Sequence, residues 1–237
     1  MRNLFKSASA CLVLSLAFSA PAMAQDASDR YFSAQSIAYA TEAQSDQAAN
    51  AHKSAIKKLK KALKLKGLKP YETSAMQQML GASYYATGKE EKAIEAFEDA
   101  IAAGGLYDSE VKKAQINIAQ LNILAKNYDV AAAQLEQYFR QGGEQNAKLM
   151  KLVFTAYMRE KNYTGALPWA EKMLDRGFVT TRPEYNNLLF LFNSPEKRTQ
   201  QIRAANRMLQ LWPGDAELQA QVEGLKRRAE YEASTAG

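Results

Sequence analysis

The sequence has almost none of the residues that build disulfides, metal centres and histidine-based active sites. Its 237 residues include one cysteine, Cys11, and one histidine, His52. A lone histidine completes neither a His/Cys metal site nor a Ser–His–Asp arrangement. We therefore expect no catalytic residue, no cofactor, no metal and no enzymatic activity, and we interpret His52 as a solvated residue at a helix start.

The sequence also lacks an apolar run long enough to span a bilayer. An uncharged stretch covers residues 8–18, well short of the roughly 20 residues that a transmembrane helix needs. Arg2 and Lys6 precede this stretch and Ala22-Met23-Ala24 follows it, a pattern typical of a secretory signal peptide with a small-x-small cleavage site. We expect cleavage before Gln25, export to the bacterial periplasm and no stable membrane insertion.

Cys11 does not fit a lipoprotein signal, because the apolar run follows it instead of preceding it. Loss of residues 1–24 would remove this cysteine together with two basic residues, and would lower the formal net charge from +6 to about +4. A charge of that size does not by itself indicate nucleic-acid binding.

An internal repeat is the strongest signal in the chain. Gly104-Gly105 recurs 38 residues later as Gly142-Gly143, and Lys126-Asn127-Tyr128 recurs 35 residues later as Lys161-Asn162-Tyr163. The repeat also has one alanine in each copy, at spacings of 38, 38 and 35 residues: Ala55, Ala93, Ala131 and Ala166. The glycine pairs lie at helix ends and do not follow strands, so they do not form a phosphate-binding loop.

The clearest copy, residues 74–106, alternates large, small and aromatic residues in a way that suits two antiparallel helices. Its positions are Leu80, Gly81, Tyr84, Ala93, Phe97 and Ala100. We expect Gly81 to face Ala93 where the two helices cross most closely, with Tyr84 and Phe97 filling the space beside that contact. Gly88-Lys89 supplies the break between the helices.

Other copies keep part of this pattern, and they define the predicted organisation. Phe154 replaces a small residue in one copy, and Gln201 does not fit a later one. We predict an all-α fold, an antiparallel helix-hairpin solenoid with four to five repeats and a polar C-terminal capping helix. The expected divisions are a signal peptide at 1–24, N-terminal helices with a degenerate repeat at 25–72, the repeat array at 73–213, and the capping helix and tail at 214–237.

Over most of residues 33–213 these positions resemble the tetratricopeptide repeat (TPR). Lys69-Pro70-Tyr71-Glu72, the 38-residue spacing and Ala166-Leu167-Pro168 are also similar to the periplasmic TPR proteins that accompany TonB–ExbB–ExbD systems. This second resemblance implies an accessory role in TonB-dependent outer-membrane transport.

The TPR resemblance also implies a concave protein-binding groove lined by the first helix of each repeat. Carried over to this sequence, the groove residues are Gln78, Tyr85, Lys113, Ile116, Gln120, Lys148, Lys151, Met158, Arg159, Asn186 and Phe190. A mixed basic and apolar groove suits a peptide segment with acidic and hydrophobic residues. The expected partner is therefore a protein, either such a segment or an envelope complex, and not a nucleic acid.

A lysine-rich segment, residues 52–69, carries eight lysines around an apolar stripe of Ile56, Leu59 and Leu63. The stripe is in register with the repeat, so packing should bury it. The lysines are interpreted as a solvated face, with an acidic partner and a membrane or nucleic-acid surface as alternatives.

Together these features predict an exported, non-enzymatic protein-binding scaffold, with TonB-dependent transport as its expected setting. The alternative is an envelope-assembly or cell-wall factor that escorts outer-membrane proteins or tethers peptidoglycan enzymes.

Overall fold

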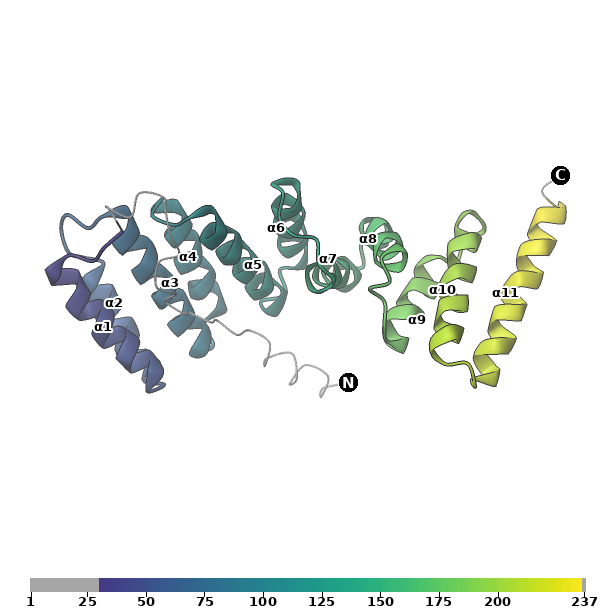
Figure 1. The fold of residues 1–237 in the computed structure, drawn as a ribbon, viewed down its shortest axis with the longest axis horizontal. Helices are drawn as coiled ribbons and strands as arrows, with labels where there is room; N and C mark the ends of the chain where they lie inside the picture. The colour runs from purple at the N-terminus through teal and green to yellow at the C-terminus, as the bar shows by residue number, and fades with distance from the viewer. Residues whose placement is uncertain (1–29, 236–237) are drawn as a thin grey trace. The chain divides into compact units, whose positions relative to one another are not determined.

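Over residues 30–235, which the structure describes, the chain consists of helices, turns and no strand (Figure 1). The structure is a computed structural model of the whole sequence. The helices of the N-terminal half are α1 (Ala34–Ala48), α2 (His52–Ala62), α3 (Pro70–Ala86), α4 (Glu90–Ala102) and α5 (Asp108–Leu124). The predicted signal peptide, its cleavage site and Cys11 lie outside the described residues.

The C-terminal half continues in the same way. Its helices are α6 (Tyr128–Arg140), α7 (Ala147–Glu160), α8 (Tyr163–Asp175), α9 (Arg182–Leu191), the short 3-10 helix η3 (Pro195–Lys197), α10 (Arg198–Leu211) and α11 (Ala216–Thr235). The chain forms two compact units, Met1–Leu121 and Asn122–Gly237. The first holds the hairpins α1–α2 and α3–α4, and the second holds α7–α8 and α9–α10.

The turns within the hairpins repeat in the backbone as well as in the sequence. A residue with positive φ stands in each of four turns, at the predicted spacings of 38, 38 and 35: Asn50, Gly88, Lys126 and Lys161. The two lysines are the first residues of the recurring Lys-Asn-Tyr motif, and each is followed by an asparagine at the start of the next helix. The left-handed conformation that reverses the chain therefore recurs with the period of the sequence.

The four alanines of the repeat all lie in the interior. Ala55, Ala93, Ala131 and Ala166 are each 0% exposed. Leu59 is also fully buried, while Ile56 and Leu63 pack against the edge of the same core. The apolar stripe of the lysine-rich segment is therefore used in packing within the first unit.

The nearest neighbour of Gly81 differs from the one that the sequence predicted. We expected Gly81 to face Ala93, but the three atoms nearest to a Cβ built at Gly81 are ring carbons of Phe97, at 3.0 to 3.1 Å. The small residue at this position therefore makes room for an aromatic ring that is 2% exposed. The ring fills the hairpin crossing itself, and not only the space beside it.

We expect Gly81→Ala to change the stability of the first unit by less than about 1 kcal/mol. The added methyl group requires the Phe97 ring to move by a few tenths of an ångström. This strain is offset by the higher helix propensity of alanine, which is worth about 1 kcal/mol. Urea unfolding followed by circular dichroism measures the difference, and a loss of about 2 kcal/mol or more would show that the ring cannot move.

Buried polar groups in the second unit explain positions that depart from the repeat pattern. Asn122 is 4% exposed; its side chain donates to Gln134 Oε1 and accepts from Asn127 Nδ2. Gln201, which does not fit the pattern, is also buried; its amide donates to the carbonyl oxygen of Leu189. These residues keep their hydrogen bonds inside the core, so they are tolerated there.

The last helix, α11, packs on α10 and buries only Leu218 and Val222. Arg198, which is 4% exposed, holds its C-terminal part through two hydrogen bonds of 3.1 and 3.0 Å to the carboxylate of Glu232, and also contacts Gln201. A helix with two buried residues and an otherwise polar surface matches the predicted cap.

Candidate protein-binding surface

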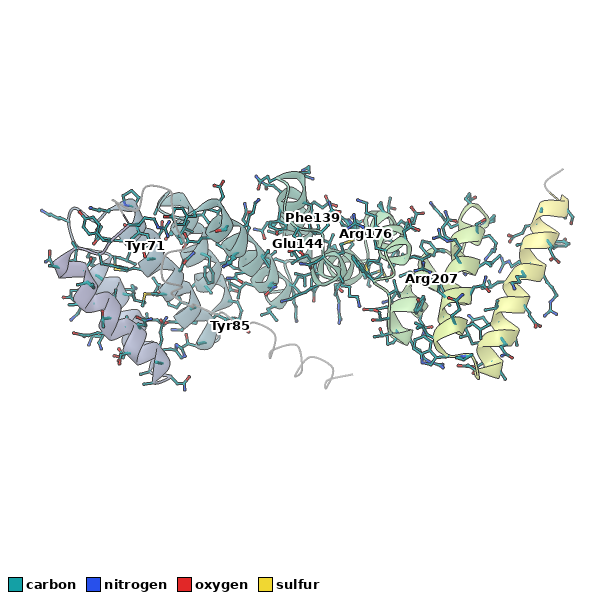
Figure 2. The ribbon with its side chains drawn as sticks, in the orientation of Figure 1. Tyr71, Tyr85, Phe139, Glu144, Arg176 and Arg207 are labelled. Atoms are coloured by element: carbon teal, nitrogen blue, oxygen red, sulfur yellow. The ribbon has the colours of Figure 1, made fainter. Side chains whose placement is uncertain are left out.

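In the first unit, the predicted groove residues come from α3 and α5. Gln78 and Tyr85 lie on α3, and Tyr85 packs its ring against the rim of the core. Figure 2 shows Tyr71 and Tyr85 toward opposite ends of that helix. Ile116 and Gln120 on α5 are half-buried, while Lys113 is exposed. These side chains all reach the surface, but no contact unites them into one site.

In the second unit, the predicted residues lie on α7 and α9. Lys148, Arg159, Asn186 and Phe190 are exposed, and Met158 is half-buried. Phe190 has the largest apolar exposure of these, since 57% of its surface is accessible.

Lys151 has a structural partner. Its Nζ lies 2.6 Å from Glu184 Oε1 and 3.4 Å from Thr180 Oγ1. Glu184 also accepts the backbone N–H groups of Thr180 and Thr181 at the start of α9. Burial raises the pKa of Glu184, but the bond from Lys151 and these backbone donors outweigh burial and lower it. Lys151 therefore fastens α7 to α9, and its charge is already balanced.

An exposed aromatic pair lies beside the predicted residues of the second unit. The rings of Tyr163, the first residue of α8, and Phe190 on α9 meet edge to face, 5.2 Å apart and at 74°. Tyr163 is 40% exposed. Tyr163 is not among the predicted groove residues. Its recurrence in the Lys-Asn-Tyr motif, beside a turn, was the signal that could have identified it. Two rings that pack on each other and remain open to solvent form a rigid apolar surface.

A network of half-buried hydrogen bonds connects α6, α7 and α8 next to this surface. Glu136 accepts hydrogen bonds from Tyr157 Oη at 2.7 Å and from Trp169 Nε1 at 3.3 Å. Burial, and then the neighbouring carboxylate of Glu136, raise the pKa of Tyr157 to about 12, so its hydroxyl stays protonated and donates. A Cβ at Gly165 would lie 2.6 Å from the Tyr157 ring, which explains the glycine next to Tyr163 and Thr164.

The lysine-rich segment is only partly a solvated face. Lys57, Lys60 and Lys61 are exposed. Lys58, by contrast, pairs with Asp46 at 2.8 Å and Glu42 at 3.3 Å, which fixes α2 to α1. His52 stands at the first position of α2, as predicted, but it is half-buried with its Nδ1 enclosed, so the expectation of a solvated side chain is wrong.

Within residues 30–235, no group of three or more histidine, cysteine or acidic side chains is placed to hold a metal ion. None of the helices in the same range is both long enough and apolar enough to cross a membrane.

Neither a protein-family model nor a curated protein matches this chain. Its likeness to solved structures is a likeness of fold. YrrB, "a TPR protein with an unusual peptide-binding site", is 16% identical with a TM-score of 0.54 over 80% of this chain and 92% of its own. A TPR protein from Parabacteroides merdae is 17% identical with a TM-score of 0.54, covering 85% and 78%. MamA from Desulfovibrio magneticus RS-1 is 15% identical with a TM-score of 0.50, covering 84% and 98%.

The hairpins, their turns and these neighbours define an all-α helix-hairpin solenoid. The solenoid is of the tetratricopeptide-repeat type, as the sequence predicted, with a capping helix at its C-terminus.

Proposed function

We propose that this chain is a non-enzymatic scaffold that binds a protein segment through the first helices of its hairpins and the adjoining start of α8. The observation that supports this most directly is the exposed pair of Tyr163 and Phe190. Exposed, rigid aromatic side chains act as anchors in protein interfaces, because they bury a large area and lose little conformational entropy. The description of YrrB as having a peptide-binding site supports a peptide segment as the ligand.

The exposed cations of the second unit indicate the chemistry of that segment. Arg159 lies at the C-terminal end of α7, which leads to Tyr163, and Lys148 lies at the other end of the same helix. A segment with hydrophobic residues for the rings and acidic residues for the cations is therefore the expected ligand.

The setting that we propose is the bacterial periplasm. It is supported by the positive, apolar and small-residue pattern of residues 1–24. The likeness of Lys69-Pro70-Tyr71-Glu72 to TPR proteins beside TonB–ExbB–ExbD systems supports an accessory role in TonB-dependent transport. The alternative setting is envelope assembly or the cell wall.

Replacing Phe190 by alanine is expected to reduce partner binding at least tenfold, because it removes the most exposed ring among the predicted groove residues. The fold should tolerate the change within about 0.5 kcal/mol, as exposed positions usually do. Leu211→Ala is the matched control, since Leu211 is 51% exposed at the end of α10 and is not a groove position.

The measurement is in-cell photo-crosslinking from position 190 and from position 211, with the captured proteins identified by mass spectrometry. Capture of a TonB-system protein from position 190 alone supports the accessory role. Capture of an outer-membrane or peptidoglycan protein from that position supports the alternative setting. Equal capture from both positions contradicts the binding surface.

A further inference from the structure

Arg30 occupies a complete guanidinium-binding site at the turns between hairpins of the first unit. Its Nη2 lies 3.0 and 2.8 Å from the two carboxylate oxygens of Glu110, and its Nη1 donates to the carbonyl oxygen of Gly105 at 3.0 Å. The guanidinium also faces two aromatic rings, with its carbon 3.6 Å from the centroid of Tyr107 and 4.5 Å from that of Tyr71. Nη2 binds the carboxylate while Nη1 binds the carbonyl, and two rings face the guanidinium. This arrangement matches the planar guanidinium with its several donors and not the point charge of lysine.

The three residues after Arg30 dock in an extended run along the same turns. The Nζ of Lys69 lies 3.4 Å from the centroid of the Tyr31 ring. Phe32 meets Tyr71 edge to face at 5.6 Å, and the N–H of Ser33 donates to Glu72 Oε1 at 2.7 Å. The segment thus uses an arginine, two aromatic rings and one backbone N–H, which are the contacts of a bound peptide.

The site is larger than the arginine that it holds. A hollow of about 500 Å³ lies beside Arg30, lined by the α2–α3 turn and the α4–α5 turn. The Arg30 side chain itself keeps 17% of its surface exposed. Solvent therefore reaches the guanidinium of Arg30, whereas Ser33 is held by the buried carboxylate of Glu72.

We propose that the turns around this hollow form an arginine-recognition site, occupied here by the chain's own Arg30 and open to the arginine of an extended partner segment when the Arg30 side chain leaves. The proposal goes beyond the scaffold function. It concerns residues 30–110 alone, so its outcome is independent of the Phe190 experiment.

The test uses the full exported chain and two acetylated, amidated tripeptides, Arg-Tyr-Phe and Lys-Tyr-Phe, each with a fluorescent label. Arg30→Ala empties the site, and fluorescence anisotropy measures binding. The arginine peptide is expected to bind this variant at least tenfold more tightly than the lysine peptide does, because lysine has no second nitrogen to donate to Gly105 while the first binds Glu110. The wild-type chain should bind the arginine peptide at least tenfold more weakly than the variant, because its own Arg30 competes at a high effective concentration.

The double variant Arg30→Ala/Glu110→Gln is the matched control and should lose the preference for arginine. Circular dichroism checks that each variant keeps its helices. If Arg30→Ala does not fold, Arg30→Lys replaces it, because lysine keeps the charge but cannot bind Glu110 and Gly105 through two separate nitrogens. Equal binding of the two peptides, equal binding by wild type and variant, or no saturable binding by a folded variant would each overturn the proposal.

Discussion

Glu72→Gln is expected to lower the free energy of unfolding of the first unit by about 3 kcal/mol at neutral pH and to remove most of its sensitivity to acid. Glu72 is 1% exposed and sits at the start of α3. One carboxylate oxygen accepts the N–H of Lys69 at 2.7 Å, and the other accepts the N–H of Ser33 at 2.7 Å and the hydroxyl of Ser36. A glutamine would turn an NH2 group toward one of these donors and leave a buried N–H without an acceptor.

The acid dependence follows from the pKa of Glu72. Burial raises this pKa, but the bonds from Lys69, Ser36 and Ser33 outweigh burial and lower it from 4.5 to about 2. Because the pKa in the folded state is below that of the unfolded chain, the stabilisation is fully present above about pH 4.5 and is lost as the pH falls toward 2. The difference of about 2.5 pH units corresponds to about 3 kcal/mol.

Urea unfolding followed by circular dichroism, repeated between pH 7 and pH 2.5, measures this effect. The Glu72→Gln curve should lie below the wild-type curve at pH 7 and approach it at the acid end. Glu91→Gln is the control, because Glu91 lies exposed on α4 and its replacement should change stability by less than about 0.5 kcal/mol. Equal midpoints for Glu72→Gln and wild type at pH 7 would mean that the three hydrogen bonds do not stabilise the fold.

The contacts of Glu72 could not be predicted from the sequence. Glu72 belongs to the Lys69-Pro70-Tyr71-Glu72 motif, but its partner Ser33 is 39 residues away. Arg30 and Glu110, which also pair, are 80 residues apart. Contacts of this kind depend on how hairpins stack. The spacing of alanines and turns depends on local helix geometry, so the positions of Ala55 and Ala93 could be read from the sequence.

The candidate surface could likewise be predicted only in part from the sequence. Phe190 could be predicted as exposed from its place in the repeat. Its pairing with Tyr163, and the pairing of Lys151 with Glu184, require the stacking of successive helices. Gln201 breaks the repeat pattern, yet it is satisfied by the carbonyl of Leu189, which no pattern of residue types reveals.

The same stacking makes Gly105 sensitive to a single methyl group. We expect Gly105→Ala to destabilise the first unit by about 2–3 kcal/mol, near the upper end of what overpacking usually costs. A Cβ at Gly105 would overlap the backbone of Pro70 and Tyr71, and a backbone cannot rotate away as a side chain can. The N–H of Gly105 also donates to Ser74 Oγ at 3.0 Å and its carbonyl accepts from Arg30, so a shift of the turn would break both bonds.

Gly214→Ala provides a matched control for this change. Gly214 lies in the α10–α11 turn, has no positive φ, and a Cβ added to it would meet nothing within 4 Å. The same substitution there should leave stability unchanged or raise it by about 0.4–1 kcal/mol, because alanine restricts the unfolded chain. Hydrogen exchange of residues 70–108, compared between the two variants, localises the effect. Faster exchange at these amides in Gly105→Ala alone is the expected result. Unchanged protection in both variants would show that the α2–α3 and α4–α5 turns do not meet at Gly105. The guanidinium site would then lose the carbonyl acceptor that Gly105 provides.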